Sequence, residues 1–370
     1  MSRLLAEIRA LRAGIAREEA LRQRENDQWN RFSAVQAQKP LSGRTKGNER
    51  ETYTDTTFLL IRAFEGDTGA RPLAAGSVFW NSPDVELYEG SELIATNQLK
   101  QGRAYTVQVN VTNLGDLAAP TCLVDLYICN PSLLLTMANA RLLGVQSTHI
   151  APHSTEIVRF GFTASAKDIG HRCLFARAYS TVTRDLPLDA DQFDTVADRH
   201  IGQQNLSVVK QGELLQVEWS PLLAANLHLT IEPTAAPALP ILARLPLGRA
   251  VRFRPLTTAP GRFELFEAAA TAPLQARLAE LVALKKKVLV GPVSAKPLLS
   301  VFGNQLKIWT PSRPNQWALP ALPAGRPRLV KATIDVPYLQ LQPQEAAVYK
   351  VELKTDKGTT VGGITLVVTA

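Results

Sequence analysis

A regular alternation of apolar and polar residues between positions 76 and 210 is the feature that most limits how this chain can fold. The clearest example is residues 105–112, where Tyr and Val alternate with Thr, Gln and Asn. A period of two places the apolar side chains on one face, which predicts a half-buried antiparallel strand. The turn signal Asn113-Leu114-Gly115-Asp116 follows. Further strands are expected at 85–88, 122–129, 155–164, 173–180 and 205–210, and together they predict a β-sandwich.

The remainder of the chain, residues 211–370, predicts a second β-sandwich with a short helical insertion at 273–287. The sequence Asp356-Lys357-Gly358 between two alternating runs indicates a hairpin. Five prolines in residues 310–328 predict a long extended loop. Gly362-Gly363, inside the last expected strand, predicts a bulge or close packing. Strands are expected at 214–219, 226–232, 249–255, 262–267, 288–290, 306–309, 349–354 and 363–368.

The first fifty residues predict a helical arm followed by a linker. Apolar residues spaced by four, three and four positions form one face of a helix and two heptads of a coiled coil, which we call the arm seam: Leu4, Ile8, Leu11 and Ile15. Two heptads are too few for a stable isolated coiled coil, so this face needs a partner. The partner is the chain's own body, a sister chain or another protein. The predicted boundaries are therefore 1–50 for the arm and linker, 51–210 for the first sandwich and 211–370 for the second.

The segment Thr56–Phe64 is apolar and rich in β-forming residues. It predicts either an N-terminal strand of the first sandwich or a strand donated to a neighbouring molecule. In the second case, Phe58, Leu60 and Phe64 are the residues that a neighbour would bind.

Positive charge is concentrated in the arm. The chain carries a net charge of +8, and residues 1–50 contribute eleven Lys or Arg against six Asp or Glu. Because the remainder is close to neutral, it lacks the basic surface of a nucleic-acid-binding domain, and we expect no nucleic-acid partner. The sequence shows no signal peptide and no apolar run long enough to span a membrane. We therefore expect cytosolic synthesis, with release or export as part of an assembly as a further route.

Catalytic motifs are absent from the sequence. The five histidines and three cysteines match no zinc spacing, and no nucleophile elbow, Walker loop or dinucleotide fingerprint occurs. Cys122 and Cys129 are expected on opposite faces of one strand, where they cannot pair with each other. His171-Arg172-Cys173 suggests a thiol nucleophile, but the apolar strand that follows favours a buried cysteine. The sequence thus predicts a non-enzyme, with a dispersed active site as a remote alternative.

Two groups of residues suggest ligands. Several aspartates within a short loop could offer oxygen ligands to calcium, which is the only cofactor considered, although the spacing fits no standard motif and a solvated loop is the simpler interpretation. Trp309 and Trp317 lie close to or within the proline-rich loop and could stack on a sugar or a partner, although a core position is more usual. The calcium candidates are Asp185, Asp189, Asp191 and Asp194.

Residues 77–210 resemble the bacterial immunoglobulin-like modules of the CARDB type. The matching stretches are Trp80-Asn81-Ser82-Pro83-Asp84-Val85 and the run from Leu99 to Gly115, which leads into the alternating strand. The resemblance implies an adhesion, scaffolding or assembly role and supplies no catalytic residues.

The sequence therefore predicts a mainly β protein of two tandem immunoglobulin-like β-sandwiches with an N-terminal amphipathic helical arm. Its predicted function is structural: the arm docks into, or oligomerises within, a larger virus-like, injection-apparatus or filament assembly. The partners are copies of the chain or other subunits. The alternative is a glycan- or receptor-binding, adhesin-like module.

Overall fold

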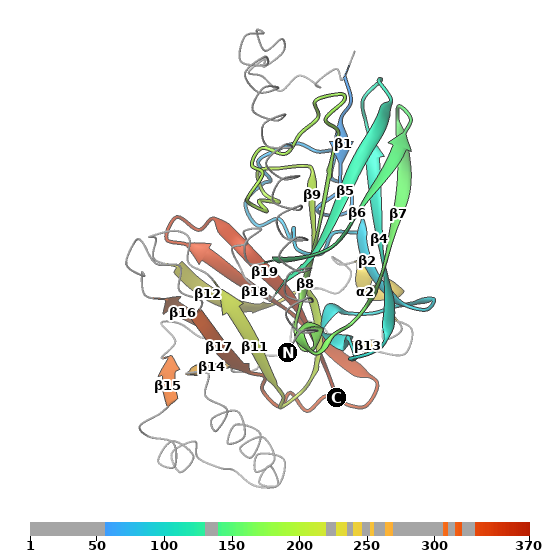
Figure 1. The fold of residues 1–370 in the computed structure, drawn as a ribbon. Coiled ribbons are helices and arrows are strands. Elements are labelled where there is room, and N and C mark those ends of the chain that lie inside the picture. Colours follow the sequence, from blue (N-terminus) through green and yellow to red (C-terminus); the bar gives the residue numbers. More distant parts are fainter. Residues whose placement is uncertain are drawn as a thin grey trace, which may run out of the picture. The chain divides into compact units, whose positions relative to one another are not determined.

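The computed structural model describes residues 56–129, 140–219, 227–234, 240–245, 252–254, 263–268, 306–309, 315–319 and 330–370. These residues belong to one compact unit, residues 53–370. The described part is mainly β, as predicted (Figure 1). The arm with its seam residues Leu4, Ile8, Leu11 and Ile15, and the expected helix at 273–287, lie outside the described residues.

Two antiparallel sheets form the N-terminal part of this unit. Sheet A has the order β1 (Leu59–Leu60), β4 (Ala104–Asn113), β2 (Val85–Glu89) and β3 (Glu92–Leu93), and β7 (Ser154–Thr163) also pairs with β4. Sheet B has the order β6 (Ala140–Ile150), β5 (Ala119–Cys129), β8 (Cys173–Tyr179) and β9 (Ile201–Gln204). Two short 3-10 helices, η1 (Thr96–Gln98) and η3 (Ala166–Asp168), lie in the connections.

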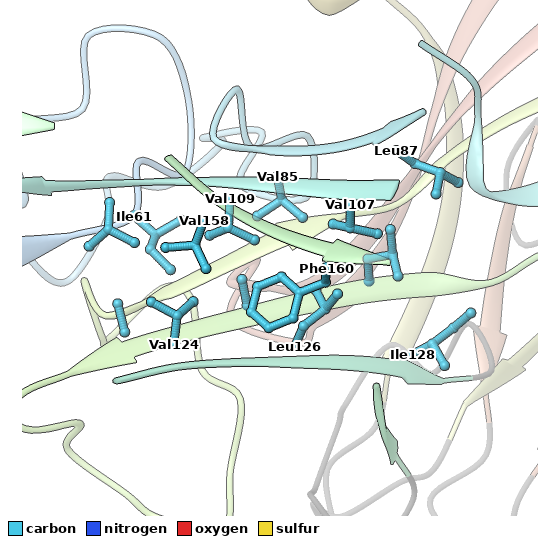
Figure 2. Packing of buried hydrophobic residues seen from close by; sticks show 14 of the residues in the cluster. Ile61, Val85, Leu87, Val107, Val109, Val124, Leu126, Ile128, Val158 and Phe160 are labelled. Atoms are coloured by element: carbon cyan, nitrogen blue, oxygen red, sulfur yellow. The ribbon is translucent and has the colours of Figure 1, made fainter. Parts of the chain in front are cut away.

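The two sheets share one apolar core, which makes this part a β-sandwich. Val107, Val109 and Val111 are fully buried, as the alternation in this strand predicted. They contribute to the same cluster as Val124 and Leu126 of β5. Figure 2 shows side chains from β2, β4 and β7 packed together with those of β5.

Two further sheets form the C-terminal part. One has the order β10 (Leu206–Lys210), β19 (Thr360–Thr369), β18 (Glu345–Thr355), β12 (Leu227–Pro233) and β16 (Gln316–Leu319), with β13 (Arg252–Phe253) also paired to β18. The other has the order β11 (Leu214–Trp219), β17 (Val330–Asp335), β14 (Glu264–Ala268) and β15 (Leu306–Trp309). Residues of both sheets enter a second shared core, and the hairpin joining β18 to β19 lies where the Asp-Lys-Gly turn predicted it.

The structure differs from the sequence interpretation in several places. The strand expected to close the first sandwich, β10, pairs in parallel with β19 of the C-terminal part. Strands β3, β6, β9 and β17 were not predicted. The region predicted as an extended proline-rich loop contains β16, which pairs with β12, and a short helix, α2 (Pro240–Arg244), was also not predicted.

A buried polar junction joins the N-terminal and C-terminal parts. The Trp80 side chain is fully buried, and its Nε1–H donates to Thr365 Oγ1 at 3.1 Å. The Asn205 amide donates to the Gly363 carbonyl at 2.8 Å. A Cβ atom at Gly363 would lie 2.5 Å from Trp80 Cε2, so only glycine fits under the indole. The predicted close packing at this glycine is therefore confirmed.

An apolar cluster adds to this junction. Ile241 and Leu242 of α2 pack with Leu93 of β3 and Val367 of β19. Arg244, at the end of α2, forms an ion pair with the buried Glu86 of β2. The two parts are thus held together by apolar contacts, hydrogen bonds and an ion pair.

Candidate protein-interaction loop

The connection between β8 and β9, residues 181–199, lies against the outer face of sheet B; we call it the display loop. Phe193 is its apolar anchor, with its ring centroid 5.0 Å from that of Tyr127 and 5.1 Å from that of Phe175. The Arg177 guanidinium donates to the Ala190 carbonyl at 2.7 Å. Aromatic packing and this hydrogen bond fix the middle of the loop to β5 and β8.

Three buried ionisable residues fix the ends of the display loop. His200 Nδ1 lies 2.6 Å from Asp198 Oδ1, and His200 Nε2 lies 2.9 Å from Asp185 Oδ1. Ionised carboxylates only accept hydrogen bonds, so both ring nitrogens carry a proton and His200 is an imidazolium. We call Asp185, Asp198 and His200 the carboxylate–imidazolium lock.

The pKa values of His200 and Asp198 agree with that protonation state. Burial lowers the pKa of His200, but the hydrogen bonds to Asp185 and Asp198 outweigh it and leave the pKa raised. Burial raises the pKa of Asp198, but the hydrogen bond and charge of His200 outweigh it and leave the pKa lowered. Arg199 forms an ion pair with Asp185, so two positive charges balance two carboxylates.

The lock also holds the first strand of sheet A. The Leu59 backbone N–H donates to Asp185 Oδ2 at 2.6 Å. The Arg199 guanidinium lies 4.1 Å from the centroid of the Phe58 ring, within the range of a cation–π interaction. The Leu188 backbone N–H donates to Asp198 Oδ2 at 2.7 Å. The same buried charges therefore determine the position of β1 and of the loop residue Leu188.

The display loop presents apolar side chains to solvent. Leu188 is 69% exposed and Val182 is 61% exposed, the two highest values among the large apolar residues of the described chain. Single exposed apolar side chains are common on protein surfaces, so these two residues are candidates for a partner contact because of the fixed loop that carries them. Exposed carboxylates follow Leu188 in sequence: Asp189, Asp191 and Asp194.

The calcium candidates separate into two roles. Asp185 is buried and bonded to His200, Arg199 and the Leu59 backbone, so its oxygens already have partners. Asp194 accepts from the backbone N–H groups of Val196 and Ala197, each at 3.0 Å. Among the residues that the structure describes, no group of three or more His, Cys, Asp or Glu side chains is arranged to hold a metal ion. The structure thus gives these aspartates structural or solvent-facing positions.

The residues suggested for strand donation lie inside the chain's own fold. Leu60 pairs with Thr112 of β4, and its side chain is buried. Phe58 is also buried, and Phe64 packs partly buried against Trp80. Of the two sequence alternatives for this segment, the structure has the N-terminal strand of the first sandwich.

Of the residues suggested for ligand stacking or nucleophilic attack, those that the structure describes are buried. Trp317 is fully buried in the C-terminal core, where no ligand can reach its ring. The Trp309 side chain lies outside what the structure describes. Cys122 and Cys129 lie in different apolar clusters, as the strand periodicity predicted. Cys173 is fully buried, and burial raises the pKa of its thiol well above the usual value.

The residues that organise this loop were not predicted from the sequence. His200, Asp198 and Leu188 were not singled out as site residues. The available signal was the pair Asp198 and His200, two positions apart, beside the acidic loop. Long-range partners such as Asp185 and Leu59 depend on tertiary structure and leave no local pattern.

Comparison with known proteins finds only weak likenesses to solved structures. Neither a protein-family model nor a curated protein matches the chain. A CARDB domain of the PF1109 protein from Pyrococcus furiosus, solved with di-metal ions, is 17% identical over 35% of this chain and 92% of that chain, with a TM-score of 0.23. A cycloisomaltooligosaccharide glucanotransferase from Paenibacillus sp. is 19% identical over 28% of this chain and 13% of that chain, with a TM-score of 0.19.

A β-glucosidase 3B from Thermotoga neapolitana is 18% identical over 28% of this chain and 14% of that chain, with a TM-score of 0.18. The matches thus span only a small part of either enzyme. At these values they carry no conclusion about activity. In the described residues, no helix has the length and apolar character needed to cross a membrane.

Proposed function

We propose that this chain is a non-catalytic assembly protein whose two tandem immunoglobulin-like sandwiches present fixed surfaces to protein partners. The N-terminal arm supplies a second point of attachment through its seam. The partners are copies of the chain or other subunits of a larger assembly.

The observation that carries this proposal is the exposed Leu188 on a loop fixed by buried charge. Ordering a flexible loop on binding costs free energy, and a loop that is already fixed avoids much of that cost. The carboxylate–imidazolium lock and Phe193 provide this order before any partner arrives. A few well-packed anchor residues dominate the binding energy of most protein interfaces, and Leu188 is proposed as one of them.

The proposal is tested by measuring the mass of the full chain by light scattering across a concentration series. We expect association, and we expect Leu188→Ser to weaken it by about tenfold or more, because an interface anchor contributes upward of about 1.4 kcal/mol. The double substitution Ile8→Asp and Leu11→Asp should weaken association through the arm.

Each matched control introduces the same residue type as its test variant, but at a position outside the proposed contact surface. Ala13→Asp places a carboxylate in the arm but off the seam, and Gln192→Ser alters an exposed residue of the display loop that is not apolar. Both should behave like the unaltered chain. A monomer at every concentration would count against self-assembly, and equal effects from controls and seam variants would count against the stated surfaces.

A further inference from the structure

Strand β6 is an edge of sheet B. It spans eleven residues, Ala140–Ile150, and within the described residues it pairs with β5 on one side only. Most of its side chains are exposed. An edge strand presents a row of backbone N–H and C=O groups that can pair with another strand.

A bulge in β6 turns two apolar side chains outward together. Leu126 pairs with Gly144, whereas the next residue, Tyr127, pairs with Leu142, so Leu143 is the extra residue. This shift places Leu142 and Val145 on the same outer face, with exposures of 46% and 48%. Leu143 instead packs against the core of the sandwich.

Apart from the bulge at Leu143, which itself disfavours pairing, the usual protections of an edge strand are missing from the middle of β6. Natural edges also carry lysine, inward-pointing charge or proline to prevent pairing. Residues 142–148, Leu-Leu-Gly-Val-Gln-Ser-Thr, contain no charged residue and no proline. The neighbouring Arg141 forms an ion pair with Asp168 at 2.5 Å, so its charge is engaged by η3.

We infer that β6 pairs with β6 of a second copy of this chain, antiparallel about a two-fold axis near Val145. An antiparallel pair of identical strands brings residues 142–148 opposite the same run reversed. Because the run is uncharged, no like charges face each other across the new ladder. The pairing would join the two copies of sheet B and place Val145 of one copy opposite Val145 of the other, with Leu142 opposite Thr148.

This inference names a partner for the proposed assembly role, and it rests on that role, but it does not use the arm or the display loop. It is a closed, two-fold contact, in which the same patch serves both copies. A second copy of the chain is therefore sufficient to pair with β6, and no other protein is needed.

The test uses the full chain carrying Ile8→Asp and Leu11→Asp, so that association through the arm is suppressed. Light scattering should show a concentration-dependent dimer. Adding Val145→Lys should raise the dimer dissociation constant at least about tenfold, since two lysines would face each other at the axis. The matched control is Ile157→Lys on β7, where the replaced side chain is similarly exposed, at 46%, and this variant should remain dimeric.

Hydrogen exchange provides a second measurement that needs no substitution in β6. Amides within residues 142–148 should become more protected as the protein concentration rises, and those of β7 should not. A monomer in the arm variant, an equal effect of Ile157→Lys, or unchanged exchange in β6 would overturn the inference. If the unaltered chain associates and the arm variant is wholly monomeric, the proposed function stands and the β6 contact fails.

Discussion

Replacing Gly363 with alanine should destabilise the protein by distorting the junction between its two parts. The new Cβ would lie 2.5 Å from Trp80 Cε2, about 1 Å or more inside ordinary carbon–carbon contact. Gly363 lies in β19, which pairs with β18 on one side and β10 on the other, so its backbone has little freedom to move. The indole must therefore be displaced.

The cost can be worked from the contacts of the indole. Trp80 is fully buried, donates to Thr365, and packs edge-on against Phe79 with ring centroids 5.1 Å apart. Overpacking a filled core costs about 1–3 kcal/mol. Losing the buried hydrogen bond adds about 1 kcal/mol. We expect a decrease in the free energy of unfolding of about 2–4 kcal/mol.

Urea unfolding followed by circular dichroism measures this change. The control is Gly161→Ala in β7, where a Cβ meets no atom within 4 Å, and where alanine should be neutral or slightly stabilising. Trp80→Leu is costly alone, but combined with Gly363→Ala the two effects should be less than additive. Equal stability of Gly363→Ala and Gly161→Ala would refute the reasoning.

Two further predictions concern buried histidines. His200→Gln should cost about 3–5 kcal/mol, because it leaves two buried carboxylates, Asp185 and Asp198, with only the Arg199 guanidinium to balance their charge. Because the folded-state pKa of His200 is raised, its protonation contributes fully to the free energy of unfolding below the unfolded-state pKa, and this contribution is lost as pH rises through the folded-state pKa. The difference in unfolding free energy between wild type and variant should therefore narrow when urea unfolding is repeated at alkaline pH. A constant difference would contradict this. Burial lowers the pKa of His171 to about 3. Between about pH 6.5 and pH 3, His171 therefore binds a proton in the unfolded chain but not in the folded one, so the free energy of unfolding should fall by about 1.4 kcal/mol per pH unit on acidification. His171→Asn should reduce this pH dependence when urea unfolding is measured over the same pH range. An unchanged pH dependence would show that His171 does not cause it.

The sequence predicted those strands whose side chains alternate cleanly. β4 matches its expected range almost residue for residue, because one face is buried in the sandwich core and the other is not. β6 was missed because it is exposed on most positions and its bulge at Leu143 interrupts the period of two. β10 was located correctly but assigned to the wrong partner, since a local pattern does not say which strand lies beside it.

The candidate site was less predictable than the fold. The acidic loop was noticed, but its aspartates look alike in sequence whether buried or exposed. Asp185 is buried because β1, from a distant part of the chain, brings a backbone donor to it. Asp191 stays exposed because nothing in the described structure covers it.

The pairing of β10 with β19 has a consequence for the order in which this protein folds during synthesis. The described strands of sheets A and B all precede Asn205, so that sandwich can close as soon as β9 has emerged. β10 follows after one residue, but Leu206 must wait for Thr365 before its ladder forms. Contacts so distant in sequence form slowly. During synthesis, side chains of η1 can already hydrogen-bond the β10 backbone, Thr96 at Leu206 and Asn97 at Val208. The edge of β10 that pairs with β19 nevertheless stays open until residue 365 has emerged, which makes it a natural point for chaperone binding in the growing chain.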